Sequence, residues 1–211
     1  MIININKPAG WTSFDVVKKI RGIIKEKKVG HAGTLDPFAT GVLILGTGSD
    51  TKKLSDISSS NKTYIADLTL GKETDTYDCD GKIVSKAKIP KLDRKEIDKV
   101  VSSFKGIIEQ IPPMYSAKKI DGVRLYKLAR QNKVVNRNPI KIKIDDIQVI
   151  RFKSSTISFQ VTCSKGTYIR VLGVDIAKKL GTVGYLSSLK RISVGSYNIA
   201  DSKLIEEITI Q

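Results

Sequence analysis

Cysteine and histidine are scarce in this sequence, which has two cysteines, Cys79 and Cys163, and one histidine, His31, among 211 residues. They form no Cys-x-x-Cys pair and no Cys/His cluster, so a structural zinc site is not expected. A disulfide would need an oxidising compartment, of which the sequence gives no sign. We therefore predict two free thiols on buried or half-buried side chains, and no metal.

Long apolar runs, targeting segments and repeats are also missing. No stretch approaches the roughly 18–20 apolar residues of a membrane-spanning helix. The first residues lack the charged-then-apolar order of a signal peptide. There is no low-complexity tract and no glycine-rich phosphate loop. Because 40% of the residues are hydrophobic, we expect a folded cytoplasmic protein with one domain over residues 1–211 and no cofactor.

Positive charge is abundant and unevenly distributed. Lys and Arg total 37 against 21 Asp and Glu, a net charge of +16. The segment from Lys118 to Lys143 holds nine basic residues and one acidic residue, Asp121, so it supplies +8 of that charge. A polyanion partner, either nucleic acid or an anionic membrane, would explain the excess, as would a generally lysine-rich proteome. The local concentration favours a nucleic-acid surface.

Hydrophobic periodicity predicts three helices and four strands. The helices are expected at 13–27, 93–104 and 167–180, and the strands at 40–46, 63–71, 140–150 and 155–163. Ser13 is the expected N-cap of the first helix, and Gly181 closes the third. Without regular βαβ alternation, the order predicts an α+β fold, with a mixed, mainly antiparallel sheet flanked by helices and loops. The basic segment interrupts this pattern as a long loop, with helical turns only at 124–130.

A glycine-rich loop at residues 30–41 is the most informative stretch. Its glycines allow tight turns and close approach of a partner. Pro37 disfavours helical backbone at Asp36, so this carboxylate should lie on a loop just before an apolar strand. Many Asp-Pro pairs are only turns. His31 in the same loop adds some weight to a functional site, and taken alone the loop leaves both interpretations open.

Six segments form an ordered set of motifs along the chain. They are NKPAGWTS at 6–13, GHAGTLDPFATGVLIL at 30–45, Lys62–Tyr64 followed by Leu70–Asp78, Gln110–Lys118 with Leu125–Tyr126, Cys163–Arg170, and Leu189–Arg191. Together they resemble the motifs of the TruB family of tRNA pseudouridine synthases, across residues 4–195. The resemblance implies the pseudouridine synthase fold with an RNA-clasping thumb loop at about 112–138. It also implies conversion of uridine 55, in the tRNA T-loop, to pseudouridine by base flipping without a cofactor.

The resemblance also implies roles for individual residues. Asp36 matches the catalytic carboxylate, Arg170 matches the arginine that pairs with it, and Tyr64 matches the tyrosine that stacks on the target base or transfers a proton. The residues expected to contact RNA are Lys7, Pro8, His31, Thr34, Met114, Tyr115, Lys118, Arg124, Tyr126, Arg130 and Tyr168. The expected partner is the T-arm of tRNA, with no membrane, no obligate protein partner and a monomeric state. Only about 16 residues follow Gly195, so no C-terminal domain of the PUA type is expected.

The chemistry is compatible with these roles but leaves alternatives open. A carboxylate can stabilise an electron-poor sugar, attack C1′ or remove a sugar proton, and the sequence does not choose between the last two. An aromatic side chain such as Tyr64 on an apolar strand face is often only core. Arg170 at a helix start could form a surface ion pair. One alternative is a non-catalytic RNA-binding protein, which would lack Asp36, Tyr64 or Arg170, and all three are present. Another is a synthase of the guide-RNA type, which the short chain and the thumb segment disfavour.

Overall fold

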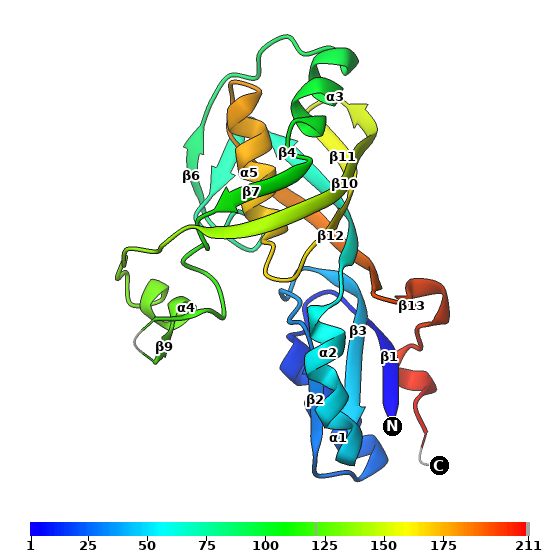
Figure 1. The fold of residues 1–211 in the computed structure, drawn as a ribbon. Helices are drawn as coiled ribbons and strands as arrows, with labels where there is room; N and C mark the ends of the chain where they lie inside the picture. The colour runs from blue at the N-terminus through cyan, green and yellow to red at the C-terminus, as the bar shows by residue number, and fades with distance from the viewer. Residues whose placement is uncertain (121, 210–211) are drawn as a thin grey trace. The chain divides into compact units, whose positions relative to one another are not determined.

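Separated stretches of the sequence come together in each of two structural units. The computed structural model describes residues 1–120 and 122–209 (Figure 1). The first unit contains Met1–Ile65, Val161–Lys165 and Ser188–Gln211, and the second contains Ala66–Gln160 and Gly166–Ser187. The strands β4 (Lys62–Leu70), β11 (Thr156–Cys163) and β12 (Gly184–Val194) contribute residues to both units.

The centre of the first unit is β3 (Thr40–Thr47). It pairs antiparallel with β1 (Ile2–Lys7) and with β2 (Val29–Ala32). The end of β12 runs parallel to it, with Arg191 opposite Gly41. The other elements of this unit are α1 (Ser13–Ile24), η1 (Gly48–Lys53), α2 (Leu54–Ser59), β13 (Tyr197–Asn198), η2 (Ile199–Asp201) and η3 (Ile205–Glu207).

Both faces of β3 are buried, which explains its continuous apolar run. Leu43 and Leu45 pack into one hydrophobic core together with side chains of α1 and β1. Val42 and Ile44 point to the other face and pack with Leu54 at the start of α2. The predicted buried strand at 40–46 is therefore confirmed, and the loop that precedes it is anchored to a rigid element.

The first helix begins with a different cap from the one expected. Thr12, not Ser13, is the N-cap of α1: its side chain accepts a hydrogen bond from the backbone N–H of Asp15, and the Asp15 carboxylate accepts one from the backbone of Thr12. Ser13 is the first helical residue and is buried. The helix ends at Ile24, before the predicted residue 27, because Lys25 adopts a left-handed conformation with φ of 54°.

The second unit is built on a sheet with strand order β12, β4, β11, β10 (Ile140–Lys153) and β7 (Gly106–Gln110), in which β10 and β7 are antiparallel. Helix α5 (Ile169–Lys179) packs closely on this sheet, because a Cβ at Gly173 would meet the Leu186 side chain at 2.8 Å. The remaining elements are β5 (Lys72–Thr74), β6 (Ile83–Lys86), α3 (Arg94–Ser102), β8 (Lys119–Ile120), β9 (Val123–Arg124) and α4 (Leu125–Ala129).

The predicted strands and helices are present with shorter or longer ends, and the α+β, mainly antiparallel fold is confirmed. Asp93 is the N-cap of α3, because its side chain accepts a hydrogen bond from the backbone N–H of Glu96. Cys163 is buried, whereas the prediction of a buried or half-buried Cys79 is wrong because this thiol is exposed. Within residues 1–120 and 122–209, no helix has the length and apolarity to cross a membrane.

Candidate active site

Asp36 lies on the loop that joins β2 to β3, and its side chain is half-buried. The loop starts at Gly33, whose φ of +77° suits a residue without a side chain. The backbone N–H of Ala39 donates to the carbonyl of Asp36 at 3.1 Å, which closes a turn around the Asp-Pro pair. The carboxylate is thus presented on a short connection whose ends belong to rigid strands.

The residues on either side of Asp36 are fixed by the N-terminal segment. The Ser13 hydroxyl accepts a hydrogen bond from the backbone N–H of Leu35 at 2.9 Å and donates one to the Leu35 carbonyl at 3.1 Å. On the other side, the carbonyl of Pro37 accepts from the backbone N–H of Gly10 at 2.8 Å and from Nζ of Lys7 at 3.2 Å. The backbone of Asp36 is therefore held immediately before and immediately after the residue.

Lys7 is fully buried, and its ammonium group binds backbone oxygens. Besides Pro37, it donates to the carbonyls of Pro8 at 2.8 Å and Trp11 at 2.6 Å. A buried charge is costly unless it is well hydrogen-bonded, and these carbonyls satisfy it. In this structure Lys7 ties the N-terminal turn to the Asp36 loop, a use that differs from the direct RNA contact expected of it.

Tyr64, the second expected catalytic residue, lies on β4, and 8% of it is exposed. Burial raises the pKa of its hydroxyl, and the nearby Asp36 and Cys163 act in the same direction. The guanidinium group of Arg191 opposes this shift through its charge and a side-chain hydrogen bond. Because the net pKa shift is upward, the Tyr64 hydroxyl is protonated at neutral pH.

In contrast to Tyr64, the side chains of His31 and Lys62 in the first unit have lowered pKa values. Burial and then the charge of Arg191 lower the pKa of His31, whose Nδ1 has no hydrogen-bond partner among the described residues. Burial, followed by the charge of Arg191, lowers the pKa of Lys62 to about 8. The Lys62 ammonium donates to the carbonyls of Ser58 and Ser60, both at 2.6 Å, at the end of α2.

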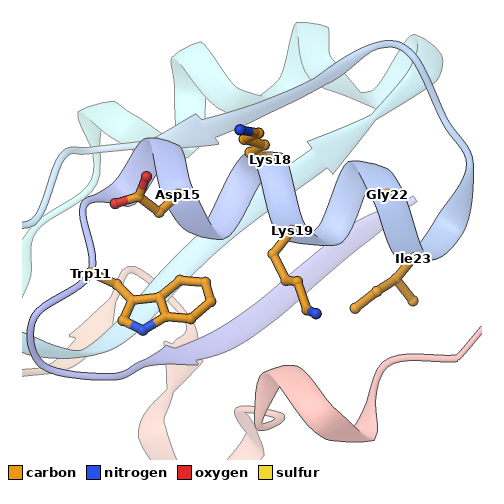
Figure 2. Close-up of a pocket in the computed structure, with 6 residues that line it drawn as sticks. All are labelled: Trp11, Asp15, Lys18, Lys19, Gly22 and Ile23. Carbon is orange, nitrogen blue, oxygen red and sulfur yellow. The ribbon is translucent and has the colours of Figure 1, made fainter.

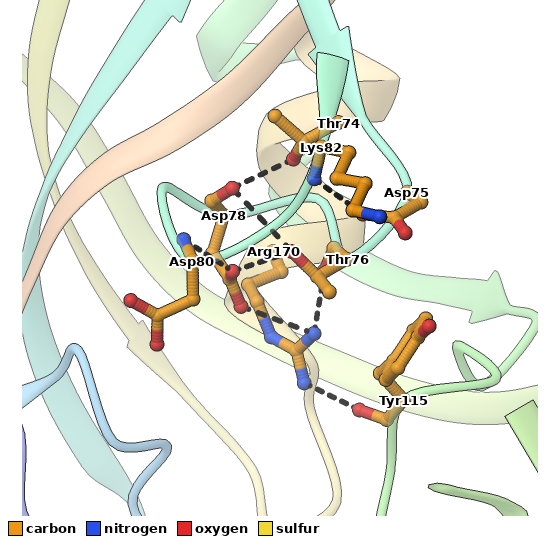
Figure 3. Close-up of polar contacts among 8 residues, drawn as sticks. All are labelled: Thr74, Asp75, Thr76, Asp78, Asp80, Lys82, Tyr115 and Arg170. Carbon is orange, nitrogen blue, oxygen red and sulfur yellow. Dashed lines mark hydrogen bonds and ion pairs between the residues drawn. The ribbon is translucent and has the colours of Figure 1, made fainter. Parts of the chain in front are cut away.

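Arg170 is the centre of a polar network in the second unit (Figure 3). It is 4% exposed, so the alternative of a surface ion pair does not apply. Its guanidinium group donates to the carbonyls of Thr76 at 2.6 Å and Tyr115 at 2.7 Å, and it lies 3.3 Å from a carboxylate oxygen of Asp78. Asp78 in turn accepts from the Thr76 hydroxyl and from the backbone N–H of Asp80. The orientation of Arg170 is fixed by several independent contacts.

The backbone of Tyr168, the N-cap residue of α5, is clamped by a buried glutamine. Oε1 of Gln110 accepts from the Tyr168 N–H at 3.0 Å, and Nε2 donates to the Tyr168 carbonyl at 3.2 Å. Gln110 is 1% exposed, and its role was not predicted. This clamp fixes the start of the helix that carries Arg170.

The predicted thumb loop contains the β8–β9 hairpin and α4. Arg124 and Arg130 are exposed, and the Arg130 guanidinium lies 5.5 Å from the centre of the Tyr126 ring. The other expected RNA contacts are half-buried or exposed in this structure: half-buried are Met114, Tyr115, Lys118, Tyr126, Tyr168 and His31, and exposed are Pro8 and Thr34. These side chains leave cations and aromatic rings accessible, as nucleic-acid contacts require.

A surface hollow of about 560 Å³ lies elsewhere on the first unit, along the outer side of α1 (Figure 2). It is lined by Trp11, Asp15, Lys18, Lys19, Gly22 and Ile23. None of the expected catalytic residues lines it. In residues 1–120 and 122–209, no three His, Cys, Asp or Glu side chains gather as metal ligands do.

Comparison with known proteins gives a consistent result. Residues 21–169 match the family model described as TruB family pseudouridylate synthase, N-terminal domain. The chain is 49% identical to tRNA pseudouridine synthase B of Clostridium kluyveri, over 97% of this chain and 71% of the relative. It is 45% identical to the protein of the same name from Lactococcus lactis subsp. lactis, over 99% of this chain and 66% of the relative.

A solved structure shows the same fold. A chain in the crystal structure of a Cbf5–Nop10–Gar1 complex is 28% identical and superimposes with a TM-score of 0.73. The match covers 93% of this chain and 49% of that chain, so the present protein spans about half the length of the solved one. A structure of an H/ACA RNP bound to a substrate RNA has the same TM-score at 24% identity.

Proposed function

Because the chain belongs to the TruB family of pseudouridylate synthases, we propose that it converts uridine 55 in the T-loop of tRNA to pseudouridine. The reaction breaks the N1–C1′ bond, turns the uracil over and joins C5 to C1′. C5 loses a proton and N1 gains one, so neither water nor an electron carrier is consumed. The curated relatives are named for tRNA pseudouridine formation, and their high identity over nearly the whole chain supports the same substrate class here.

The geometry around Asp36 carries this proposal. The carboxylate acts at the sugar, either by attacking C1′ or by removing a sugar proton, and both routes need the oxygen at a fixed place beside the ring. Hydrogen bonds at Leu35 and Pro37 hold the backbone on both sides of Asp36. A turn that only connected two strands would not need a buried serine and a buried lysine to fix it.

Tyr64 is suited to form one wall of the pocket that receives the flipped base. Its ring offers a stacking face, and its raised pKa keeps the hydroxyl neutral, so no tyrosinate charge repels the nearby Asp36 carboxylate. The same hydroxyl can take part in proton transfer as the uracil rearranges. Tyr64 thus serves both as a core residue of its strand and as a residue of the site.

Arg170 is the proposed partner of the Asp36 carboxylate. Its network with Thr76, Tyr115 and Asp78 presents a permanently charged, planar donor group in one orientation. The carbonyl of Tyr115 belongs to the proposed thumb loop. A change of that loop on RNA binding would therefore alter this hydrogen bond and the position of the guanidinium group.

The proposed RNA interface is the basic thumb loop. Extrusion of a base costs a few kcal/mol of stacking, which phosphate contacts from Lys and Arg side chains can offset. Arg124, Arg130 and Lys118 lie in this loop, and Tyr126 adds an aromatic face. The chain is more similar to the named tRNA enzymes, at 49% identity, than to the Cbf5 chain, at 28%, which favours tRNA as the substrate.

The test is pseudouridine mapping on an unmodified tRNA transcript, on an isolated T-arm hairpin, and on a transcript with cytidine in place of uridine 55. We expect product at position 55 of the first two RNAs and none in the third. Product at another position would overturn the assigned site. A folded protein that binds the transcript without modifying it would support the alternative of a non-catalytic RNA-binding protein.

A further inference from the structure

Arg191 is an unusual residue, because it is the largest fully buried side chain of the described residues and is only 1% exposed. Among residues 1–120 and 122–209, no carboxylate forms an ion pair with it. Burying a guanidinium group without a counter-charge is unfavourable, and a well-packed apolar side chain in its place is often neutral or stabilising. Its presence therefore needs an explanation other than core packing.

The guanidinium group connects the start of the loop that carries Asp36 with the strand that follows the loop. Nε donates to the carbonyl of Val42 at 2.7 Å, and one terminal nitrogen donates to the carbonyl of Gly33 at 3.0 Å. Gly33 precedes Asp36 by three residues and Val42 follows it by six. A single side chain thus bridges the point where the loop begins and the strand into which it runs.

The backbone of Arg191 pairs with the strand into which this loop runs. Arg191 lies opposite Gly41 in the parallel pairing of β12 with β3. Gly41 has a φ of +101°, and a Cβ at this position would overlap the carbonyl oxygen of Arg191. A side chain at position 41 would therefore prevent this pairing, and Gly41 allows the backbone of Arg191 to approach β3 closely.

Arg191 also faces the other proposed functional side chain of this unit. Its guanidinium group is close enough to the Tyr64 hydroxyl to lower the pKa of that group, against the larger effect of burial. Its charge reaches His31 and Lys62 as well. The planar fork of an arginine can serve several acceptors at once, which a lysine ammonium in the same place cannot do with the same geometry.

We propose that Arg191 is a positioning residue for pseudouridine formation, which sets the place of the Asp36 loop relative to the Tyr64 hydroxyl without touching the RNA. The inference rests on the proposed function. It differs from a purely structural role in what it predicts: loss of Arg191 should slow the chemical step in a protein that still folds and still binds RNA.

The test compares Arg191→Lys and Arg191→Met with the wild type and with a matched control. Arg21 is an exposed arginine on α1 of the same unit, so Arg21→Lys and Arg21→Met make the same chemical changes outside the site. Each protein is assayed for single-turnover pseudouridine formation at saturating enzyme, for affinity to the T-arm hairpin, and for its melting temperature. We expect the Arg191 variants to lose about 10- to 100-fold in rate, Met more than Lys, with RNA affinity kept and with no rate loss in the Arg21 variants.

Two further readouts separate positioning from structure. If Arg191 acts through the Tyr64 hydroxyl, the rate losses of Arg191→Lys and Tyr64→Phe should not multiply in the double variant. Because His31 is the only histidine, its NMR titration is unambiguous, and Arg191→Met should raise its pKa. A rise would place the charge beside the loop independently of catalysis.

Each result has a defined meaning. Wild-type rates in folded Arg191 variants, a lower melting temperature with an unchanged rate, or a failure of both variants to fold would overturn the positioning role. A wild-type protein that forms no pseudouridine would instead overturn the proposed function, and this inference with it. A slow, folded, RNA-binding Arg191→Lys beside an unchanged Arg21→Lys would establish it.

Discussion

Four cationic side chains, Lys7, Lys62, Arg170 and Arg191, are buried, and backbone carbonyl oxygens accept hydrogen bonds from all of them. Carbonyls in loops and at helix ends have no partner within a ladder, so they are available to such donors. Each cation therefore holds backbone in a loop or at a helix end, at Gly33 in the case of Arg191, which also binds Val42 within β3. The irregular segments held in this way include those proposed to carry the catalytic groups.

The single histidine gives a pH prediction at the residue scale. Burial and the nearby Arg191 lower the pKa of His31, so the unfolded chain takes up a proton at a higher pH than the folded chain does. Stability should therefore rise with pH between the folded pKa and the ordinary value near 6.5, and should be lost as pH falls through this interval. Urea unfolding from about pH 5 to 7.5 measures the slope, and His31→Gln should remove this component. An unchanged slope in that variant would contradict the assignment.

At this scale the sequence predicted positions better than environments. The carboxylate of Asp36 on a loop before a buried strand followed from the Asp-Pro pair and the apolar run. The burial of Lys7 and Arg191 could not be predicted, because Lys and Arg are mostly exposed and only the folded backbone shows which carbonyls lack another donor. The motif at 189–191 marked Arg191 without giving it a role.

At the scale of elements, the start of α1 combines two tasks in neighbouring residues. Thr12 caps the helix through the capping box with Asp15, whereas Ser13 turns inward and binds the backbone of Leu35. One hydroxyl thus supports the helix and the next supports the Asp36 loop. The two can be tested separately, because they differ by one position and have similar chemistry.

We expect Thr12→Ala to lower the free energy of unfolding by about 1 kcal/mol, as the loss of an N-cap does, with little change in rate. Ser13→Ala should cost a similar amount of stability and also slow pseudouridine formation, because the backbone at Leu35 loses both of its bonds to Ser13. Denaturant unfolding and single-turnover rates on the same preparations check both. Equal rate losses in the two variants would show that Ser13 has no special link to the site.

The helices and strands with strong periodicity were predictable from the sequence, and the connections were not. Alternation along 63–71 predicted the strand with Tyr64 inward, and spacing along 93–104 predicted α3. The cap of α1 was misplaced by one residue because Thr12 and Ser13 are equally good caps locally, and only the loop at Leu35 decides between them. The β8–β9 hairpin is too short to leave a periodic signal.

At the scale of the whole molecule, we expect the excess of positive charge to contribute most of the affinity for RNA. The net charge is +16, and half of it lies between Lys118 and Lys143. Phosphate contacts release counterions, so affinity should fall steeply as salt rises. The question is whether the thumb loop supplies this effect or whether any exposed lysine would do.

Two double variants with the same change in net charge answer it. Lys127→Gln with Lys133→Gln removes exposed charges from the thumb loop, and Lys91→Gln with Lys95→Gln removes exposed charges elsewhere in the second unit. We expect the first pair to reduce the slope of log affinity against log salt by about 1 for each phosphate that the protein no longer neutralises, and the second pair to leave it unchanged. Equal slopes for the two double variants would show that the salt dependence comes from the overall charge and not from the thumb loop.

The carboxylate of Asp36 is proposed to perform the chemistry, and the most direct test of this role is the single-turnover rate at uridine 55 with Asp36→Asn. Asp56→Asn, an exposed carboxylate on α2 of the same unit, is the matched control. We expect Asp36→Asn to bind the tRNA transcript as the wild type does but to lose at least about 10³-fold in rate, while Asp56→Asn retains full activity. Substantial pseudouridine formation by folded Asp36→Asn would contradict it.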